Sequence, residues 1–237
     1  MFKMNLKNIV FFTTLLITSN VFALEFQGKF IQGHFILGKT HPDSKIWVDK
    51  KKVKITNDGY FVFGIGRDRN YDITITKELK GNKEQIVKKI LKRKYNIQRI
   101  NGIEPEKVDP PKSVLDRIYL ERKIVRESRN KAALIKELFY NNGFSVPASG
   151  PISGVYGSQR ILNGKAKSPH YGIDIALPEG YSVLAPMDGI VLFIHNDLYF
   201  SGGTIIIGHG QGLTTSYLHL SEILVEKEEI IKKGHLI

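Results

Sequence analysis

The first hundred residues show the alternation of apolar and polar positions that is typical of half-buried β-strands. Residues 45–49, 52–55 and 71–76 carry this pattern. The Asn-Asp-Gly sequence at residues 57–59 predicts a hairpin turn, because Gly and Asx residues adopt positive φ readily. Together these signals predict a small antiparallel sandwich or barrel over residues 24–101.

A helical pattern follows within residues 102–144. Residues 104–111 predict a linker, because the two prolines at its end cannot occupy a helix interior. Ser113, with Asp116 three residues later, is an N-terminal capping pattern, and apolar residues then recur at helical spacing as far as an Asn-Asn-Gly stop signal. The predicted helix has about 27 residues and a length of about 40 Å. The pattern leaves open whether it packs on the next domain or covers a cleft there.

Strand signals return after Phe144. Residues 181–185, 190–194 and 204–207 are apolar runs separated by Gly and Pro turns. We therefore predict a second β domain over residues 145–237, which makes the whole chain mostly β.

Residues 1–23 have the features of a secretory signal peptide. Lys3 and Lys7 precede an apolar run at residues 9–17, and small residues stand at −3 and −1 of a cleavage site after Ala23. The run is shorter than the roughly 20 residues that a spanning helix needs, although an uncleaved anchor is the alternative. This predicts export to the periplasm or cell envelope and argues against nucleic acid as a partner.

Composition narrows the chemistry. The chain has no cysteine, so a metal must be held by His and carboxylate side chains. The formal charge of +12 favours anionic partners such as carboxylates of wall polymers or the lipid of the envelope. The alternative is that the lysines are spread over solvated faces.

His170 and Asp174 are the candidate metal ligands. Both residue types bind zinc at about 2.0–2.2 Å. Residues four apart in a straight strand are about 13 Å apart, so the pair can share an ion only if the chain bends, as Pro169 and Gly172 allow. Taken alone, the spacing is weak evidence for a metal site and fits a surface His near a buried Asp better.

Further motifs follow in a fixed order. They are residues 156–164, 170–174, 178–180, 183–191, 209–210 and 217–220. The ordered set resembles the lysostaphin-type (LytM-like) zinc metallopeptidases, which cut peptide cross-links in bacterial peptidoglycan. The resemblance implies a two-lobed antiparallel β fold of the duplicated hybrid motif type, with one zinc ion on the floor of a groove.

The resemblance also implies roles for individual residues. His170 and Asp174 match the first two zinc ligands, and His219 matches a catalytic imidazole beside the attacking water. The alternative for His219 is a structural His on a strand, and His209 is expected to be structural. Arg160 and Asn163 are either substrate-binding residues at the groove rim or ordinary loop residues, with Asn163 making a turn.

The family's third ligand is the last His of a His-x-His motif, which has no counterpart in this chain. His235 is a poor substitute by its spacing. We therefore expect weak zinc binding, an incomplete sheet with an exposed apolar end at residues 236–237, and impaired cleavage.

Three hypotheses follow from the sequence. The first is a zinc endopeptidase acting on peptidoglycan peptides, impaired in this chain. The second is a non-catalytic protein that binds the cell wall or regulates other wall hydrolases. The third is a basic β protein that adheres to anionic polymers or lipid.

Overall fold

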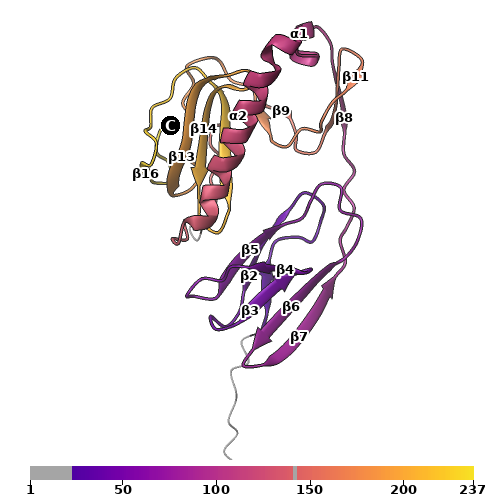
Figure 1. Cartoon of the computed structure of the whole chain (residues 1–237), viewed down its shortest axis with the longest axis vertical. Coiled ribbons are helices and arrows are strands. Elements are labelled where there is room, and N and C mark those ends of the chain that lie inside the picture. The colour runs from indigo at the N-terminus through magenta and orange to yellow at the C-terminus, as the bar shows by residue number, and fades with distance from the viewer. Residues whose placement is uncertain (1–22, 141–142) are drawn as a thin grey trace, which may run out of the picture.

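The computed structural model describes residues 23–140 and 143–237, so the predicted signal peptide, except for its last residue, lies outside it. Figure 1 shows two β-rich parts stacked along the long axis of the molecule, with helix α2 beside the C-terminal part. The mostly β class is confirmed. No helix of the described residues is long and apolar enough to cross a membrane.

The N-terminal part contains two antiparallel sheets. One has the order β1-β2-β5 and the other the order β4-β3-β6-β7. Their strands are β1 (Glu25–Gln27), β2 (Phe35–Lys39), β3 (Lys45–Val48), β4 (Lys51–Val53), β5 (Tyr60–Gly64), β6 (Ile73–Leu79) and β7 (Asn82–Lys88). A single core takes fully buried side chains from both sheets, among them Ile36, Ile46, Phe61 and Ile75.

The predicted hairpin at residues 57–59 is a turn but does not join paired strands. Gly59 has φ +83°, and a Cβ there would lie 1.8 Å from the carbonyl oxygen of Thr40. Strand β5 pairs with β2, whereas β4 pairs with β3 in the other sheet. The hairpin prediction was wrong because the turn carries the chain from one sheet to the other.

Strand β8 (Ile97–Ile100) joins the two parts. It pairs in parallel with β10 (Gln159–Leu162), which also pairs with β11 (Lys165–Ala166). The end of the predicted N-terminal domain therefore contributes to a sheet with the C-terminal part.

Two further contacts hold the parts together. Arg67 Nε donates to the carbonyl oxygen of Gly157 at 2.7 Å. The Gln211 amide donates to the carbonyl oxygens of Lys54 and Tyr60 at 3.2 and 3.1 Å.

The helical segment is shorter than predicted. It consists of α1 (Pro105–Val108), α2 (Lys112–Lys131) and a 3₁₀ turn, η1 (Ala132–Leu134). Helix α2 has 20 residues, and its N-cap is Pro111 rather than Ser113. The chain becomes extended at Ile135, because this residue and those after it contact the sheet. Ile135 lies against Gly208, and the Phe139 N–H donates to the backbone carbonyl oxygen of His209.

The C-terminal part is built on an antiparallel sheet of order β15-β14-β13-β16. Its strands are β13 (Gly189–Leu198), β14 (Gly202–Gly208), β15 (Thr214–Leu220) and β16 (Ile230–Ile231), and β9 (Ile152–Gly154) pairs separately with β12 (Asp174–Ile175). Ile205 and Ile207 lie in the main core. Ile206, between them, points to the opposite face and belongs to a smaller cluster that Val125 of α2 covers.

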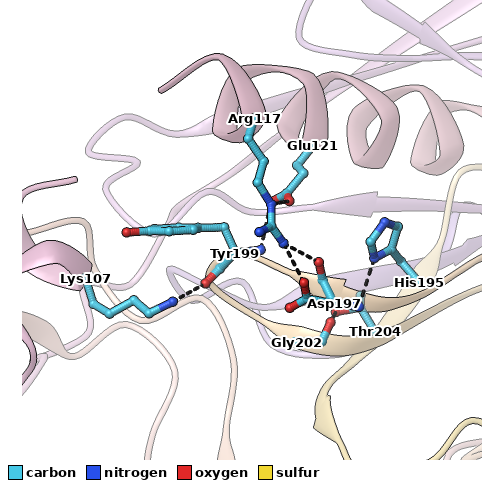
Figure 2. A network of polar contacts seen from close by, with 8 residues as sticks. All are labelled: Lys107, Arg117, Glu121, His195, Asp197, Tyr199, Gly202 and Thr204. Carbon is cyan, nitrogen blue, oxygen red and sulfur yellow. Dashed lines mark hydrogen bonds and ion pairs between the residues drawn. The ribbon is translucent and has the colours of Figure 1, made fainter. Parts of the chain in front are cut away.

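Polar contacts fix the helices on this sheet (Figure 2). Arg117 of α2 donates to the Asp197 carbonyl and carboxylate at 2.6 and 2.9 Å. Glu121 accepts from Arg117 Nε at 2.7 Å and from the Tyr199 N–H at 2.9 Å. Lys107, just before α2, donates to the Tyr199 carbonyl at 2.7 Å. The helix thus packs against the β13–β14 hairpin, which answers the question that its sequence left open.

The exposed apolar end that we predicted at residues 236–237 is wrong for Ile237 and confirmed for Leu236 alone. Ile237 is 3% exposed and belongs to the main core, and its N–H donates to the Val183 carbonyl at 3.0 Å. Leu236, which is 40% exposed, forms an antiparallel bridge with Leu184.

Candidate metal centre

His170 is held by its backbone. Its N–H donates to the Ser158 carbonyl at 2.9 Å, and its carbonyl accepts from the Gly157 N–H at 2.7 Å. These two hydrogen bonds fix the loop before β12 against the loop after β9. Because the side chain is buried, its neighbours restrict its rotamers, and the position of the backbone decides where the ring lies.

Asp174 begins β12 and is paired with Gly154 of β9. Because the chain bends at Gly172, Nε2 of His170 lies 3.1 Å from Oδ1 of Asp174. Two donors that each lie 2.0–2.2 Å from one tetrahedral zinc ion are separated by about 3.3 Å. The observed 3.1 Å is close to this separation, so the two side chains are candidates for a shared zinc ion, and without a metal it is the distance of a direct hydrogen bond between them.

The other oxygen of Asp174 lies against Gly154. A Cβ on Gly154 would be 2.1 Å from Oδ2, far closer than any real contact. The carboxylate occupies the space that the missing side chain leaves. Gly154 gave no signal in the sequence, because nothing local distinguishes a glycine that makes room for a distant carboxylate.

The ring of His170 is suited to metal binding. Burial lowers its pKa, the charge of Arg160 lowers it further, and Asp174 opposes both effects. Its buried Nδ1 makes no hydrogen bond of ordinary geometry, although the nearby Val155 carbonyl favours a proton there. A lowered pKa keeps the imidazole neutral near pH 7, which is the form that binds a metal.

Arg160 lies beside the same carboxylate. Its Nη2 is 3.0 Å from Asp174 Oδ2, and its Nε is buried without a hydrogen-bond partner. The guanidinium thus holds one oxygen of Asp174 and leaves Oδ1 directed at His170. Such an outer partner orients a metal-binding carboxylate.

Asn163 is engaged with the linker. It and Gly164 have φ +47° and +79° in the turn between β10 and β11. Its side-chain amide donates to the Ile103 carbonyl at 2.6 Å and accepts from the Ile103 N–H at 3.2 Å. This geometry is the turn that the sequence analysis gave as one alternative.

His219 lies on strand β15. It is exposed on β15 with φ +61°, and its N–H donates to the Ser201 carbonyl at 2.8 Å. No hydrogen bond or ion pair within the described chain joins its ring to His170 or Asp174. Across residues 23–140 and 143–237, no group of three His, Cys, Asp or Glu side chains is placed to hold a metal ion.

Two other histidines have structural partners. His209 is fully buried, with Nδ1 2.7 Å from the Asp188 carbonyl oxygen and Nε2 2.8 Å from Thr215 Oγ1. Nδ1 must donate, since a carbonyl only accepts. Burial lowers the pKa of His209, so the ring is neutral near pH 7 and Nε2 accepts from the Thr215 hydroxyl. His235 Nε2 lies 3.9 Å from a Glu229 carboxylate oxygen.

Comparison with known proteins identifies the C-terminal part. Residues 168–237 match the model of peptidase family M23. This segment is an M23 domain. It begins two residues before His170 and includes every strand of the β15-β14-β13-β16 sheet.

Relatives of the M23 domain differ in their described activities. The peptidoglycan DD-endopeptidase ShyA of Vibrio cholerae is 41% identical over 73 residues, which is 31% of this chain and 17% of ShyA. The murein hydrolase activator NlpD of Escherichia coli is 34% identical over 74 residues, which is 31% of this chain and 20% of NlpD. The chain thus spans about a fifth of the length of these relatives.

A solved structure resembles a larger share of the chain. A crystal structure from Pseudomonas aeruginosa, assigned to peptidase M23, superposes with a TM-score of 0.60 at 21% identity. The match covers 89% of this chain and 82% of that one. This likeness shows a shared fold that extends beyond the M23 domain to the N-terminal β strands.

Proposed function

We propose that the M23 domain is a zinc endopeptidase of peptidoglycan peptides, with His170 and Asp174 as two of the zinc ligands, and that cleavage is impaired in this chain because the described residues offer no third ligand. The observation that carries the proposal is the 3.1 Å separation of His170 Nε2 and Asp174 Oδ1 in a bent segment. The similarity to ShyA supports peptidoglycan as the substrate.

A bound zinc ion supplies an activated water and polarises the scissile carbonyl. The protein's part is to present donors in the right state. His170 offers a neutral Nε2 because burial lowers its pKa, and Asp174 offers Oδ1 because Arg160 holds Oδ2. Gly154 leaves the room that this carboxylate orientation requires.

His219 is proposed as the imidazole that exchanges a proton with the attacking water or stabilises the developing oxyanion. Its exposed ring supports this role, because a solvent-accessible imidazole can accept and return a proton. Arg160 and Asn163 are proposed as contacts for the substrate peptide. Arg160 already contacts Asp174, and Asn163 already contacts Ile103, so each would bind the peptide through its remaining N–H donors.

The proposed site of action is the cell envelope. The sequence features of residues 1–23 predict export, and the basic charge favours the carboxylate-bearing wall polymer. Other wall hydrolases are possible partners.

A second candidate function is activation of such a hydrolase or binding to the wall without cleavage. The similarity to NlpD favours this function. The cluster also favours it, because the described residues bring together two metal donors beside a guanidinium, whereas a catalytic zinc site uses three protein ligands.

Digestion of purified peptidoglycan distinguishes the two. Sacculi are incubated with the zinc-supplemented protein, and released muropeptides are separated by chromatography, with His170→Ala as the test variant and His235→Ala as the control. New peptide ends that disappear in His170→Ala and persist in His235→Ala support the peptidase. Sacculus binding without cleavage, equal in all three proteins, supports the second candidate.

A further inference from the structure

A groove next to the candidate metal centre is lined by residues from both parts of the chain. It is shallow and open to solvent, with a volume of about 530 Å³. The lining consists of the loop from Gly66 to Arg69, Tyr71, Tyr156 and Tyr171. Tyr171 directly follows His170 in the chain, so the groove lies beside the proposed zinc ligand.

Two exposed tyrosine rings flank this groove, one from each part. Tyr71 is 63% exposed and Tyr171 is 62% exposed. Both are nevertheless supported: the Arg69 guanidinium stacks 4.1 Å from the centre of the Tyr71 ring, and Tyr171 contacts the Tyr156 ring edge-to-face at 6.1 Å. Rings that are held in place lose little conformational entropy when a ligand packs on them.

Arg69 supports its tyrosine and has little capacity left for a ligand. It makes two hydrogen bonds to the Asp49 carboxylate at 2.8 and 3.0 Å. It also donates to the Tyr71 carbonyl at 2.9 Å and to the Asp72 carbonyl at 2.6 Å. Four of its five N–H donors are therefore used, and its charge is balanced by Asp49.

Arg67 is similarly balanced. It donates to the Gly157 carbonyl across the boundary between the two parts and pairs with the exposed carboxylate of Asp68. Each arginine of the groove thus has its own carboxylate, and the groove is close to neutral. An anionic peptide would find no free cation here, whereas a neutral polar ligand would meet two aromatic faces and hydrogen-bonding groups.

The geometry points to a saccharide-binding groove that holds the glycan of the substrate next to the peptide centre. A sugar ring has C–H faces that pack on aromatic rings and hydroxyls that bond to carboxylate, guanidinium and phenol groups. This inference rests on the proposed function for its substrate, but binding of the sugar requires neither zinc nor cleavage. Because Tyr71 and Tyr171 come from different parts, a glycan would also stabilise their observed arrangement.

The test is binding of a β-1,4-linked N-acetylglucosamine tetramer to the metal-free full chain, followed by calorimetry and by saturation-transfer NMR. We expect measurable binding, weakened about five- to tenfold by Tyr71→Ala and by Tyr171→Ala. Tyr71→Phe and Tyr171→Phe, which keep the stacking ring, should stay within about twofold of the original affinity. Tyr119→Ala, at a ring equally exposed on α2, should have no effect.

Three results would overturn the inference. They are no binding of the tetrasaccharide, binding that neither alanine variant weakens, and tyrosine-dependent binding of a sugar-free stem peptide in place of the sugar. If the protein bound the sugar but did not cleave sacculi, the proposed peptidase activity would be wrong and the saccharide-binding groove would stand. If the protein cleaved sacculi but showed no tyrosine-dependent sugar binding, only the proposed role of the groove would be wrong.

Discussion

The Oδ2 oxygen of Asp174 occupies the space in which a side chain on Gly154 would begin. The two residues are paired across β9 and β12, and a Cβ on Gly154 would lie 2.1 Å from that oxygen. The position of the carboxylate thus depends on a glycine 20 residues earlier in the chain, and the orientation of Oδ1 towards His170 depends on it in turn.

Gly154→Ala should therefore weaken zinc binding at least about tenfold, since the added methyl group must displace the carboxylate. Competition with a chromophoric chelator measures the affinity. Gly64→Ala is the matched control, because Gly64 is an exposed strand glycine with no atom within 4 Å of its would-be Cβ. Equal affinities in the two variants would show that Asp174 does not bind the ion in this orientation.

The local features of the site could be predicted from the sequence. Pro169 and Gly172 allowed the bend, and the bend brings His170 and Asp174 together. The contact of Arg160 with Asp174 could not be predicted, because the two residues lie on strands β10 and β12 of different sheets, whose relative placement local sequence does not specify. The same holds for the groove, whose tyrosines are 100 residues apart.

The fold shows the same division. Alternation of apolar and polar residues located β3, β4 and β6, and continuous apolar runs located β13 and β14, since both signals are local. The strand predicted at residues 181–185 was wrong, because only an isolated bridge at Leu184 forms there. The sheet to which each strand belongs was not predictable from alternation. Strand β5 follows β4 in the chain but pairs with β2, and β8 pairs with β10. Helix α2 ended early because Ile135 packs against Gly208, a contact that helical periodicity does not contain.

His209 should make the stability depend on pH. Burial lowers the pKa of His209 in the folded protein below the ordinary value. The contribution of His209 to the free energy of unfolding is therefore complete above about pH 6.5. This contribution is lost as the pH falls, because the unfolded chain then takes up the proton more readily than the folded protein. The slope from this group can reach about 1.4 kcal/mol per pH unit. Urea denaturation between pH 7.5 and 5 measures it.

His209→Gln removes this titration and should flatten the curve, even though its stability at pH 7 is lower. Ile207→Val, at a core residue that does not titrate, serves as the control and should keep the original slope even where it lowers the stability. A slope unchanged in His209→Gln would mean that His209 takes up a proton in the folded state as readily as in the unfolded chain.

Glu121 is expected to be the main polar anchor of α2, because it accepts hydrogen bonds from both Arg117 and the Tyr199 backbone. Glu121→Ala should lower the free energy of unfolding by about 1–2 kcal/mol. Glu127→Ala, at an exposed position of the same helix, should change it by less than about 0.5 kcal/mol. Thermal or urea denaturation compares them, and equal losses would contradict an anchoring role for Glu121.

Ile237 should contribute to the stability of the M23 domain, since it is buried in the main core. Ile237→Ala should cost about 2–3 kcal/mol, and Leu236→Ala, at its partly exposed neighbour, less than about 1 kcal/mol. Urea denaturation measures both. If Leu236→Ala were the more destabilising change, the packing of the last two residues would be the reverse of that described.

The central claim is that His170 and Asp174 bind the same zinc ion, and chelator competition on the purified 237-residue protein tests it most directly. We expect weak, exchangeable zinc binding, because the described cluster offers two protein donors. This binding should be lost in both His170→Ala and Asp174→Ala and should be unchanged in His235→Ala. Zinc binding that survives either of the first two substitutions at full affinity would contradict it.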